Sequence, residues 1–384
     1  MARHLATLRT TKGYEKFLDW GKSVLERTPV VGAPVYDALH GMKKGIKDFI
    51  APQGLFEDLG LKYIGPIDGH NISDMEFAFQ RARDFGGPVI VHVITEKGRG
   101  YKPAETDEAD RFHAVGIVDP DTGRPLTQSA KSWTSVFSGE LVAIGSQRQD
   151  LVAITAAMLG PTGLDAFAEK FPTRTFDVGI AEQHAVTSAV GMAHAGLHPV
   201  IAIYSTFLNR AVDQVIMDCA LHKAGVTFAL DRSGVTGDDG ASHNSMWDMA
   251  LLRVVPNLDL FAPRDGQQLK SALRNSVSKS DHPTVIRFSK GAIPADIAAV
   301  TQLGFADVLV AAEQPEVTIV AIGVMATQSL EAAKSLQDQG FRVEVIDPIQ
   351  VLPISPDLID YLSTREFVVT IEDGLVDGGI GEAI

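Results

Sequence analysis

The sequence predicts an α/β fold built on mostly parallel sheets with helices on both faces. Three observations support this prediction. Short runs rich in valine and isoleucine recur along the chain, helical patterns separate most of them, and 35 of the 384 residues are glycines, which suit tight strand-to-helix turns. Continuous apolar strands that alternate with helices are typical of parallel sheets buried on both sides.

Composition limits the classes of function. Hydrophobic residues make up 45% of the chain and charged residues 21%, as in ordinary globular proteins, and the length predicts two or three domains. The net charge is −14, without a basic block, so we expect neither nucleic acid nor a membrane surface as a partner. The single cysteine, Cys219, excludes an intramolecular disulfide framework and indicates a reducing compartment. With no secretory signal and no long apolar stretch, we expect a cytoplasmic protein.

Residues 1–125 form the first predicted region. Helical periodicity extends to about residue 50, and a helix over 73–85 and a strong strand over 88–95 follow. The stretch 104–125 is polar and acidic and contains proline and glycine, which indicates a linker between domains.

Regular strand–helix alternation defines a second region, residues 126–292, and a third, residues 305–384. Predicted strands of the second region cover 151–155, 175–178, 200–204, 226–230, 258–261 and 284–287, and its helices cover 180–195, 207–222 and 266–277. The third region has predicted strands over 318–322, 342–346 and 367–371 and a helix over 326–339. Because the sequence stops within a strand–turn–helix pattern, we interpret this last domain as incomplete.

Polar residues follow several of these strands. Tyr204 and Arg287 end two of them, Arg232 comes directly after a third, and Lys97 follows the strand of the first region. Ligands of open parallel sheets bind beyond the carboxyl ends of the strands, so these positions are candidate binding residues.

Glu182 is the most informative single residue. It is the only charged side chain of the predicted helix 180–195 apart from histidines, so the helix is predicted to be buried. A desolvated carboxylate favours its protonated form and suits proton sharing near neutrality. The alternative is an acidic residue stabilised by the helix dipole, and the residues alone do not decide between the two. We interpret His184 and His194 as core histidines.

Residues 231–243 form a polar, glycine-rich loop after a buried strand. The loop carries Arg232, Asp238, Asp239 and His243. On composition alone, a flexible turn is the favoured interpretation of this segment.

Five blocks together resemble one enzyme family. They read YIGPIDGH (63–70), EKGRGY (96–101), DVGIAEQH (177–184), YSTFLNRA (204–211) and DRSGVTGDDGASH (231–243). In this order they resemble 1-deoxy-D-xylulose 5-phosphate synthases, thiamine-diphosphate enzymes of the transketolase superfamily, and most of all the actinobacterial members.

The resemblance implies a thiamine-diphosphate-binding fold with a partial C-terminal transketolase-type domain. Residues 1–125 then match the C-terminal part of the first, diphosphate-binding domain plus a linker. Residues 126–292 match the pyrimidine-binding middle domain, and residues 305–384 match an incomplete C-terminal domain. The family holds the diphosphate and Mg²⁺ through a Gly-Asp-Gly turn and a later asparagine. No Gly-Asp-Gly occurs here. We therefore expect no metal ligands in this sequence, interpret it as truncated at both ends, and expect the Mg²⁺ ligands on a missing N-terminal segment.

The resemblance also implies roles for the cofactor-binding residues. Glu182 matches the carboxylate that hydrogen-bonds the aminopyrimidine ring of the cofactor and activates it. Phe207 matches the ring that stacks on the aminopyrimidine. Lys97 and Tyr101 match cofactor contacts from the end of the first domain.

For the substrates, the resemblance implies that Tyr204, Arg232 and Arg287 hold the acceptor phosphate. Two guanidinium groups suit a dianion, since each forms charge-assisted hydrogen bonds. His113, Asp239 and His243 match polar groups near the reacting carbons, where imidazoles are suited to proton transfer.

The implied reaction joins pyruvate to D-glyceraldehyde 3-phosphate with loss of CO₂ and gives 1-deoxy-D-xylulose 5-phosphate, a precursor of isoprenoids, thiamine and pyridoxal. The enzyme class is a transketolase-type transferase that forms a homodimer. Two alternatives stay open: a pyruvate dehydrogenase β-type or other superfamily subunit, and a non-catalytic remnant. Residues 1–103 count against a β-type subunit, which lacks such a region. Whether this chain is active alone is left open.

Overall fold

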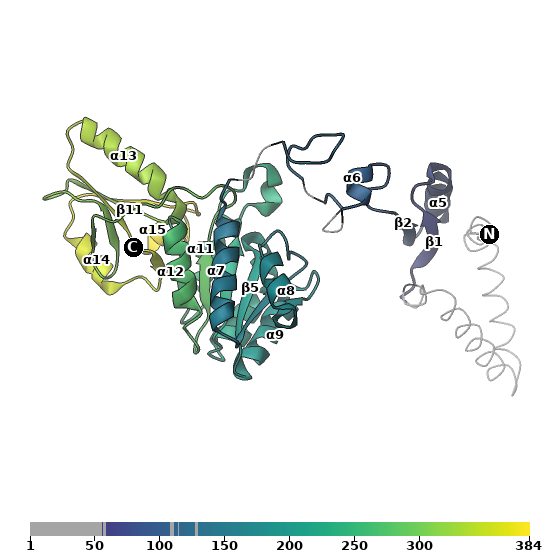
Figure 1. Ribbon diagram of the computed structural model, residues 1–384, viewed down its shortest axis with the longest axis horizontal. Helices are drawn as coiled ribbons and strands as arrows, with labels where there is room; N and C mark the ends of the chain where they lie inside the picture. The colour runs from purple at the N-terminus through teal and green to yellow at the C-terminus, as the bar shows by residue number, and fades with distance from the viewer. Residues whose placement is uncertain (1–55, 57–58, 108–110, 114, 127–129) are drawn as a thin grey trace, which may run out of the picture. The chain divides into compact units, whose positions relative to one another are not determined.

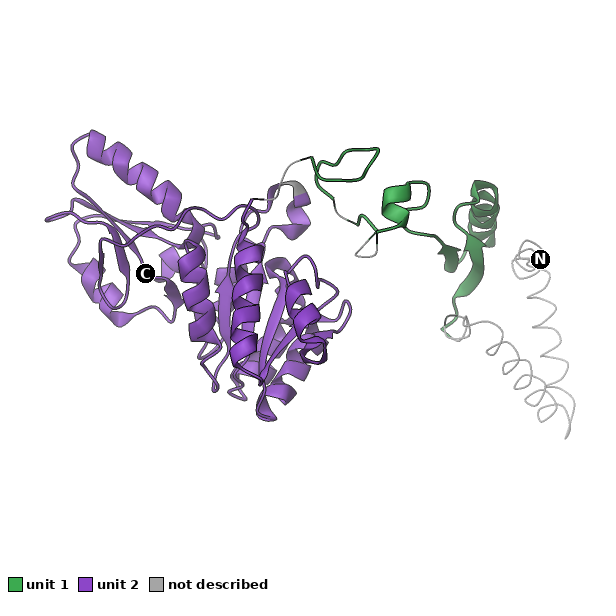
Figure 2. Ribbon diagram, viewed as in Figure 1, with its two compact units in different colours: residues 1–126 green, residues 127–384 purple. Residues whose placement is uncertain are grey.

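The computed structural model describes residues 56, 59–107, 111–113, 115–126 and 130–384. The chain divides into two compact units, residues 1–126 and 127–384 (Figure 1 and Figure 2). The helical periodicity predicted up to residue 50 lies outside the described residues.

The first unit contains a βαβ motif. Strands β1 and β2 pair in parallel, and helix α5 connects them. Helix α5 begins after Asn71, whose side chain accepts a hydrogen bond from the Asp74 amide, and ends at Gly86 with a left-handed φ of 72°. The predicted helix and strand of this region are confirmed. The bounds are β1 (Lys62–Asp68), α5 (Ile72–Phe85), β2 (Val89–Ile94) and α6 (Lys102–Glu105).

The second unit is built on a seven-stranded sheet with the order β13-β7-β8-β6-β5-β3-β4. All neighbouring strands are parallel except β13, which joins β7 antiparallel at one edge. The bounds are β3 (Leu151–Thr155), β4 (Thr175–Asp177), β5 (His198–Tyr204), β6 (Thr227–Asp231), β7 (Asp259–Phe261), β8 (Thr284–Arg287) and β13 (Gln350–Leu352). All six strands predicted for this region are therefore confirmed, with shifts of up to two residues at their ends.

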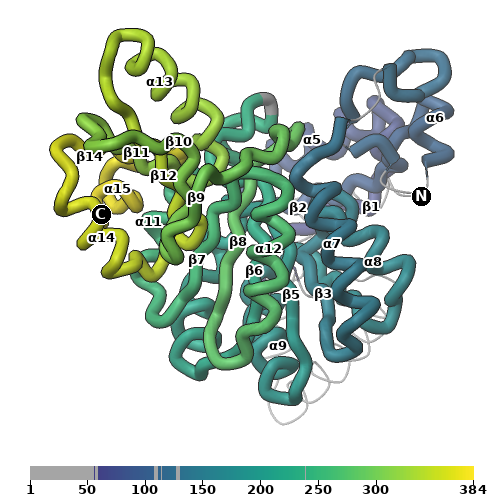
Figure 3. Tube along the Cα trace, turned by 60° about the vertical axis from the view of Figure 1, so that its left-hand side comes forward, coloured from purple at the N-terminus to yellow at the C-terminus, as the bar shows by residue number. Residues whose placement is uncertain are grey.

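Both faces of this sheet are buried, because successive side chains of a strand point to opposite sides. In β3, Ala153 packs into one core and Ile154 into the other. The first core lies under α7 (Trp133–Gln147), α8 (Asp165–Lys170) and α12 (Gly266–Ser276), and the second under α9 (Glu182–His194) and α11 (Asp248–Leu252) (Figure 3). The apolar strands predicted from the sequence thus form a sheet covered on both sides.

One predicted helix, 207–222, is not a continuous α-helix. It consists of a 3₁₀ segment (Ser205–Ala211), one α-turn, α10 (Val212–Gln214), and a π-helical segment (Val215–Ala220). Ser205 and Thr206 donate side-chain hydrogen bonds to Asp248 and to the Ser242 carbonyl, which hold the first turn tightly against the neighbouring loops. Such irregular turns occur often at functional sites.

The C-terminal part contains a five-stranded sheet with the order β14-β11-β12-β10-β9. Because β13 leaves this part to join the seven-stranded sheet, the second and third predicted regions form one compact unit. The bounds are β9 (Thr301–Gln302), β10 (Asp307–Val310), β11 (Val317–Ala321), α13 (Ala326–Asp338), β12 (Val343–Asp347), α14 (Pro356–Ser363), β14 (Val368–Ile371) and α15 (Ile380–Ala383). Among the described helices, none is long and apolar enough to span a bilayer.

A buried ion-pair cluster joins the two sheets of this unit. The Arg264 guanidinium, just after β7, lies 2.8 Å from an Asp307 oxygen and 2.7 Å from an Asp347 oxygen. Asp265 is a third carboxylate, 3.3 Å from the Arg264 Nε. Burial raises the pKa of Asp347 to about 6, although Arg264 opposes this shift. One cation therefore holds three desolvated carboxylates.

We predict that Arg264→Met lowers the free energy of unfolding at pH 7 by about 3–5 kcal/mol, because it leaves buried carboxylates unpaired. Arg342→Met is the matched control: Arg342 pairs with Glu316 at the surface, where the two side chains are 54% and 37% exposed. We expect that control to lose less than about 1 kcal/mol. Urea unfolding of both variants makes the comparison, and equal losses would contradict the prediction.

Candidate active site

The carboxyl ends of β5, β6 and β8 meet at one edge of the seven-stranded sheet. In the strand register Tyr204 lies opposite Asp231, and Leu230 lies opposite Arg287. Arg232 follows directly after β6. The three predicted residues Tyr204, Arg232 and Arg287 therefore lie at the same edge of the sheet.

Four of the predicted site residues form an aromatic and cationic cluster. The Arg232 guanidinium lies over the Tyr204 ring, with 4.0 Å between the guanidinium carbon and the ring centre. The Tyr204 ring stacks on Phe207 at 5.8 Å and 13°, and the His243 ring meets both edge-on at 6.2 and 5.6 Å. Arg232 has a φ of 59°, an uncommon backbone for a side chain other than glycine. The loop 231–243, interpreted as a flexible turn on composition, thus folds back onto the sheet edge.

Asp239 brings the charges of this cluster together. Its Oδ2 atom lies 2.8 Å from the Lys290 Nζ and 3.7 Å from the Arg232 Nε. Lys290 is not among the predicted site residues. Its position three residues after β8, at the same sheet edge, is the signal that would have found it. Burial raises the pKa of Tyr204, so its hydroxyl stays protonated at neutral pH and can donate a hydrogen bond.

Arg287 has different surroundings from Arg232. Its side chain is 2% exposed. Its Nε donates to Asp248 Oδ2 at 2.9 Å, and its Nη1 and Nη2 donate to the two carboxylate oxygens of Asp373 at 2.7 and 3.2 Å. In this geometry a phosphate could reach Arg287 only by displacing a carboxylate, so the structure does not support its predicted role as a phosphate ligand.

Glu182 is the first residue of α9, which packs against the 3₁₀ segment that carries Phe207. Glu182 is 3% exposed. Within the described residues its carboxylate has no hydrogen bond or ion pair, and its oxygens are not among the fully buried polar atoms, so they stay accessible. An accessible carboxylate without a protein partner, on an otherwise buried side chain, fits a ligand that hydrogen-bonds it, such as an aminopyrimidine ring.

Only one face of α9 is buried, contrary to the prediction from its composition. His184 and His194 lie on its exposed face, so their interpretation as core histidines was wrong. The sheet covers α9 from one side, and an almost uncharged sequence does not reveal which side is left open.

The predicted residues of the first unit line a cavity of about 680 Å³. Lys97, Tyr101 and His113 face it together with Arg99 and Arg111. The hydroxyl oxygen of Tyr101 is buried and lacks a hydrogen-bond partner among the described residues. These three predicted residues therefore share one cavity, which offers several cationic groups to an anionic ligand.

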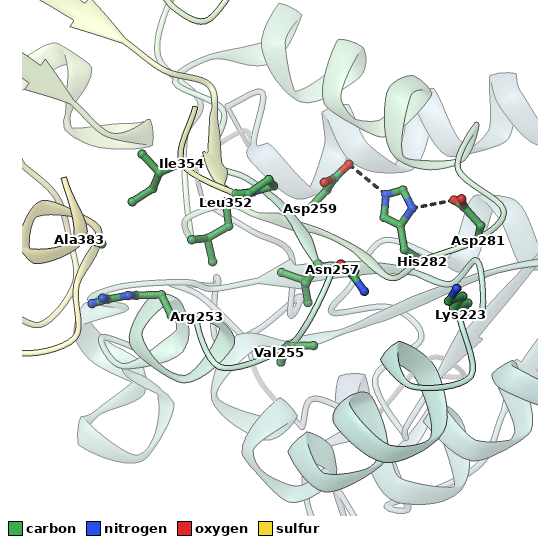
Figure 4. Close-up of a pocket in the computed structure, with 12 residues that line it drawn as sticks. Lys223, Arg253, Val255, Asn257, Asp259, Asp281, His282, Leu352, Ile354 and Ala383 are labelled. Atoms are coloured by element: carbon green, nitrogen blue, oxygen red, sulfur yellow. Dashed lines mark hydrogen bonds and ion pairs between the residues drawn. The ribbon is translucent and has the colours of Figure 1, made fainter. Parts of the chain in front are cut away.

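A second cavity, of about 730 Å³, lies at the amino ends of β7 and β8, the opposite edge from Tyr204 (Figure 4). There His282 lies between two carboxylates, 3.1 Å from Asp259 and 2.7 Å from Asp281. None of the predicted site residues lines this cavity.

Within the described ranges, no group of three or more His, Cys, Asp or Glu side chains is placed to hold a metal ion. The expected Mg²⁺ site stays a prediction.

Comparison with known proteins places the chain in a family. Residues 129–295 match the family model of the transketolase pyrimidine-binding domain, residues 1–95 that of 1-deoxy-D-xylulose-5-phosphate synthase, and residues 306–384 that of the transketolase C-terminal domain. Over its whole length the chain is 60% identical to a 1-deoxy-D-xylulose-5-phosphate synthase 2 from Streptomyces avermitilis and 57% identical to a 1-deoxy-D-xylulose-5-phosphate synthase from Frankia casuarinae.

The chain belongs to the 1-deoxy-D-xylulose-5-phosphate synthase family. It spans about 60% of the length of those two synthases. Among solved structures it is similar to a protein described as "Split gene transketolase, inactive beta4 tetramer", with a TM-score of 0.59 and 30% identity over 66% of this chain and 84% of the other. A transketolase from Leishmania mexicana shares the fold, with a TM-score of 0.56 and 21% identity over 66% of this chain and 40% of the other.

One more buried carboxylate of this synthase-family chain lies at the site edge. The Asp231 Oδ2 accepts a hydrogen bond from the Thr134 hydroxyl at 2.6 Å, and its Oδ1 lies 3.4 Å from the Arg232 guanidinium. Burial raises the pKa of Asp231 to about 6, against the opposing effect of these two partners. In the unfolded chain this carboxyl has an ordinary pKa of about 4. Between the two values the folded protein therefore holds one more proton at this position.

This difference predicts a pH dependence of stability. The contribution of Asp231 to the free energy of unfolding is fully present below about pH 4 and is lost as the pH rises to about 6, at about 1.4 kcal/mol per pH unit. Asp231→Asn should remove that slope. Urea unfolding at pH 4, 5, 6 and 7 measures the difference between the variant and the parent protein, and parallel profiles would contradict the assignment.

Proposed function

We propose that the chain carries the pyrimidine-binding and acceptor-binding parts of a thiamine-diphosphate-dependent transferase. The proposed reaction joins pyruvate to D-glyceraldehyde 3-phosphate with loss of CO₂ and gives 1-deoxy-D-xylulose 5-phosphate. The carrying observation is the unpartnered carboxylate of the otherwise buried Glu182 side chain at the start of α9, next to the segment that bears Phe207.

The residues present fit the pyrimidine end of the cofactor. Thiamine diphosphate, when bound, supplies the carbon nucleophile that takes up pyruvate and releases CO₂. Glu182 would hold a proton between its carboxylate and a ring nitrogen of the pyrimidine, and Phe207 would stack on the ring face. From the first unit, Lys97 and Tyr101 would contact the cofactor.

The cluster at the sheet edge fits the acceptor. Arg232 and the protonated Tyr204 hydroxyl would bind the phosphate group of D-glyceraldehyde 3-phosphate. His243, which borders both aromatic rings, would exchange a proton with the acceptor aldehyde. For Asp239 and His113 we propose polar contacts near the reacting carbons.

The family match of residues 1–95 favours a synthase over a pyruvate dehydrogenase β-type subunit. The solved split-gene transketolase, which matches 66% of this chain, is described as inactive. That description, together with the lack of Gly-Asp-Gly in the sequence, supports weak cofactor binding by this chain alone.

A reducing, cytoplasmic setting is proposed from the single cysteine, Cys219. Burial raises the pKa of its thiol to about 12.

We further propose that the protein forms a homodimer through the exposed face of α9 and the adjoining π-helical segment, called here the α9 face. A hydrogen bond of 2.6 Å from Thr187 to Asp218 joins the two elements. Apolar side chains are exposed around it: Ile180 by 85%, Met217 by 50% and Leu221 by 55%. Gly191 leaves open space on the same side of the helix, which permits close approach of a second helix. A large apolar surface with few charges is typical of obligate dimers.

We predict that the chain binds thiamine with a dissociation constant of roughly a millimolar, since one charge-assisted hydrogen bond and one stacking contact supply only a few kcal/mol. Glu182→Gln should weaken this binding about tenfold or more, because the amide cannot share the proton. Glu169→Gln makes the same change at an exposed position on α8 and should leave thiamine binding unchanged. Isothermal titration with thiamine, and with thiamine diphosphate plus Mg²⁺, measures all three proteins.

Equal binding by the parent protein and Glu182→Gln would overturn the assignment of Glu182, and no thiamine binding at millimolar concentration would overturn the proposed function. Sub-micromolar, Mg²⁺-dependent binding of thiamine diphosphate would contradict only the expectation that this chain grips the diphosphate weakly. Product formation from pyruvate and D-glyceraldehyde 3-phosphate should depend on Glu182 wherever it is detected.

For the dimer, we predict that Met217→Glu combined with Leu221→Glu yields a monomer, because an interface would bury two unpaired carboxylates. Val300→Glu is the control. It places one carboxylate on a residue that is 66% exposed elsewhere in this unit, and it should leave the dimer intact. Sedimentation equilibrium measures the mass of each protein. A monomeric parent protein, or a double variant that still dimerises, would contradict the proposal.

A further inference from the structure

The cavity at the amino ends of β7 and β8 shares no lining residue with the proposed active site. It lies where the C-terminal part joins the middle part, since Leu352 ends β13 and Ala383 ends α15. Its volume of about 730 Å³ suits a small organic molecule. Both parts contribute apolar residues to its lining, namely Val255, Leu258, Leu352, Pro353, Ile354 and Ala383.

Arg253 is held in the lining of this cavity by one nitrogen of its guanidinium. The side chain is 27% exposed, and its Nη1 donates to the Gly379 carbonyl and to Glu382 Oε2, both at 2.9 Å. The Gly378 amide donates to the same Glu382 oxygen at 2.7 Å, which fixes that carboxylate. Among the described residues, neither Nε nor Nη2 of Arg253 has a partner. The guanidinium can therefore bind an anion and still keep its own ion pair.

Lys223 is a second cation of the lining. Figure 4 shows it well apart from Arg253, with Val255 and Asn257 between the two. The Lys223 side chain is exposed and has no hydrogen bond or ion pair in the described ranges. Its backbone is defined by a left-handed φ of 54° and by a hydrogen bond of 3.1 Å from its amide to the Ala220 carbonyl. The cavity therefore has a cationic group at each of two separate places.

The acidic residues of the lining, by contrast, already have partners. His282 lies 3.1 Å from Asp259 and 2.7 Å from Asp281. Gln350 on β13 donates to the other carboxylate oxygen of Asp259 at 3.2 Å. Arg253 and Lys223 are thus the charged groups that the described lining leaves available to a ligand. A molecule that complements them is anionic at two separate points and apolar between them.

We propose that this cavity binds an elongated organic dianion with one carboxylate at each end and an aliphatic middle. One carboxylate accepts hydrogen bonds from Nε and Nη2 of Arg253, and the other pairs with Lys223. The carbon chain lies against the apolar lining, where its burial is favourable. Arg253 contributes more than Lys223, because a partly buried guanidinium forms charge-assisted hydrogen bonds and an exposed ammonium is screened by water. This site is at the opposite edge of the sheet from Tyr204 and is independent of the proposed reaction.

Isothermal titration with three matched probes at constant, low ionic strength tests this inference. Adipate has both carboxylates, hexanoate has the same carbon chain with only one, and hexamethylenediamine has the opposite charge at both ends. We expect the parent protein to bind adipate about two- to fivefold more tightly than hexanoate, as for one exposed ion pair, and not to bind the diamine. Lys223→Gln should abolish the preference for adipate. Arg253→Gln should weaken binding of both acids by roughly tenfold or more.

Two control variants separate binding from a structural effect. Glu382→Gln removes the ion pair that holds Arg253 but leaves its Nε and Nη2, so adipate binding should persist. Lys334→Gln removes a charge from an exposed position on α13 and should leave the preference for adipate unchanged.

The proposal would be overturned by a parent protein that does not bind adipate, that binds hexanoate as tightly, or that binds the diamine. Equal losses in Arg253→Gln and Glu382→Gln, or in Lys223→Gln and Lys334→Gln, would also overturn it. The comparison of the three probes uses the parent protein alone, so it decides the question even if Arg253→Gln does not fold.

Discussion

The double ion pair of Arg287 is the interaction on which the candidate site depends most. Its guanidinium joins the end of β8 to Asp248 at the start of α11 and to Asp373 just beyond β14. Asp248 also accepts a hydrogen bond from Ser205, at the start of the segment that carries Phe207, and Ser205 accepts one from Ser245. One buried cation thus fixes the sheet edge, the aromatic segment and the C-terminal part relative to one another. The same arrangement explains why an arginine at the end of a strand need not be a ligand-binding residue.

Much of the fold could be predicted because its strands are buried on both faces. β3 and β8 have the predicted bounds, since each has a short apolar centre with polar residues close on both sides, which leaves little freedom in placing its ends. Helix α7, by contrast, was not predicted. Its apolar residues are spread around the helix rather than gathered in one stripe, and its capping box at Ser132 is a weak signal without that stripe.

The sequence predicted several residues of the candidate site, but it did not predict which of their side chains pair with one another. Strand ends pointed to Tyr204, Arg232 and Arg287, yet charge type alone could not show that Arg287 faces two carboxylates from distant segments. Lys290 was missed for the complementary reason, because a lysine three residues beyond a strand looks like an ordinary surface residue until its neighbour Asp239 is in place. Similarly, the exposed face of α9 follows from what covers the helix and not from its composition.

Gly234 has a consequence for exchanging parts between related proteins. A Cβ atom there would lie 2.2 Å from the Asp373 carboxylate, and the glycine has a left-handed φ of 75°. The middle and C-terminal parts therefore meet closely at this point, because Gly234 has no Cβ atom and the Asp373 carboxylate occupies that space. A chimera that combined this middle part with a foreign C-terminal part would need a carboxylate at the position of Asp373 to fill this space and to accept the hydrogen bonds of the Arg287 Nη1 and Nη2. Chimeras that preserve overall similarity but break this glycine–aspartate match would leave two nitrogens of the buried Arg287 guanidinium without acceptors, so compatibility between the parts depends on two positions far apart in sequence.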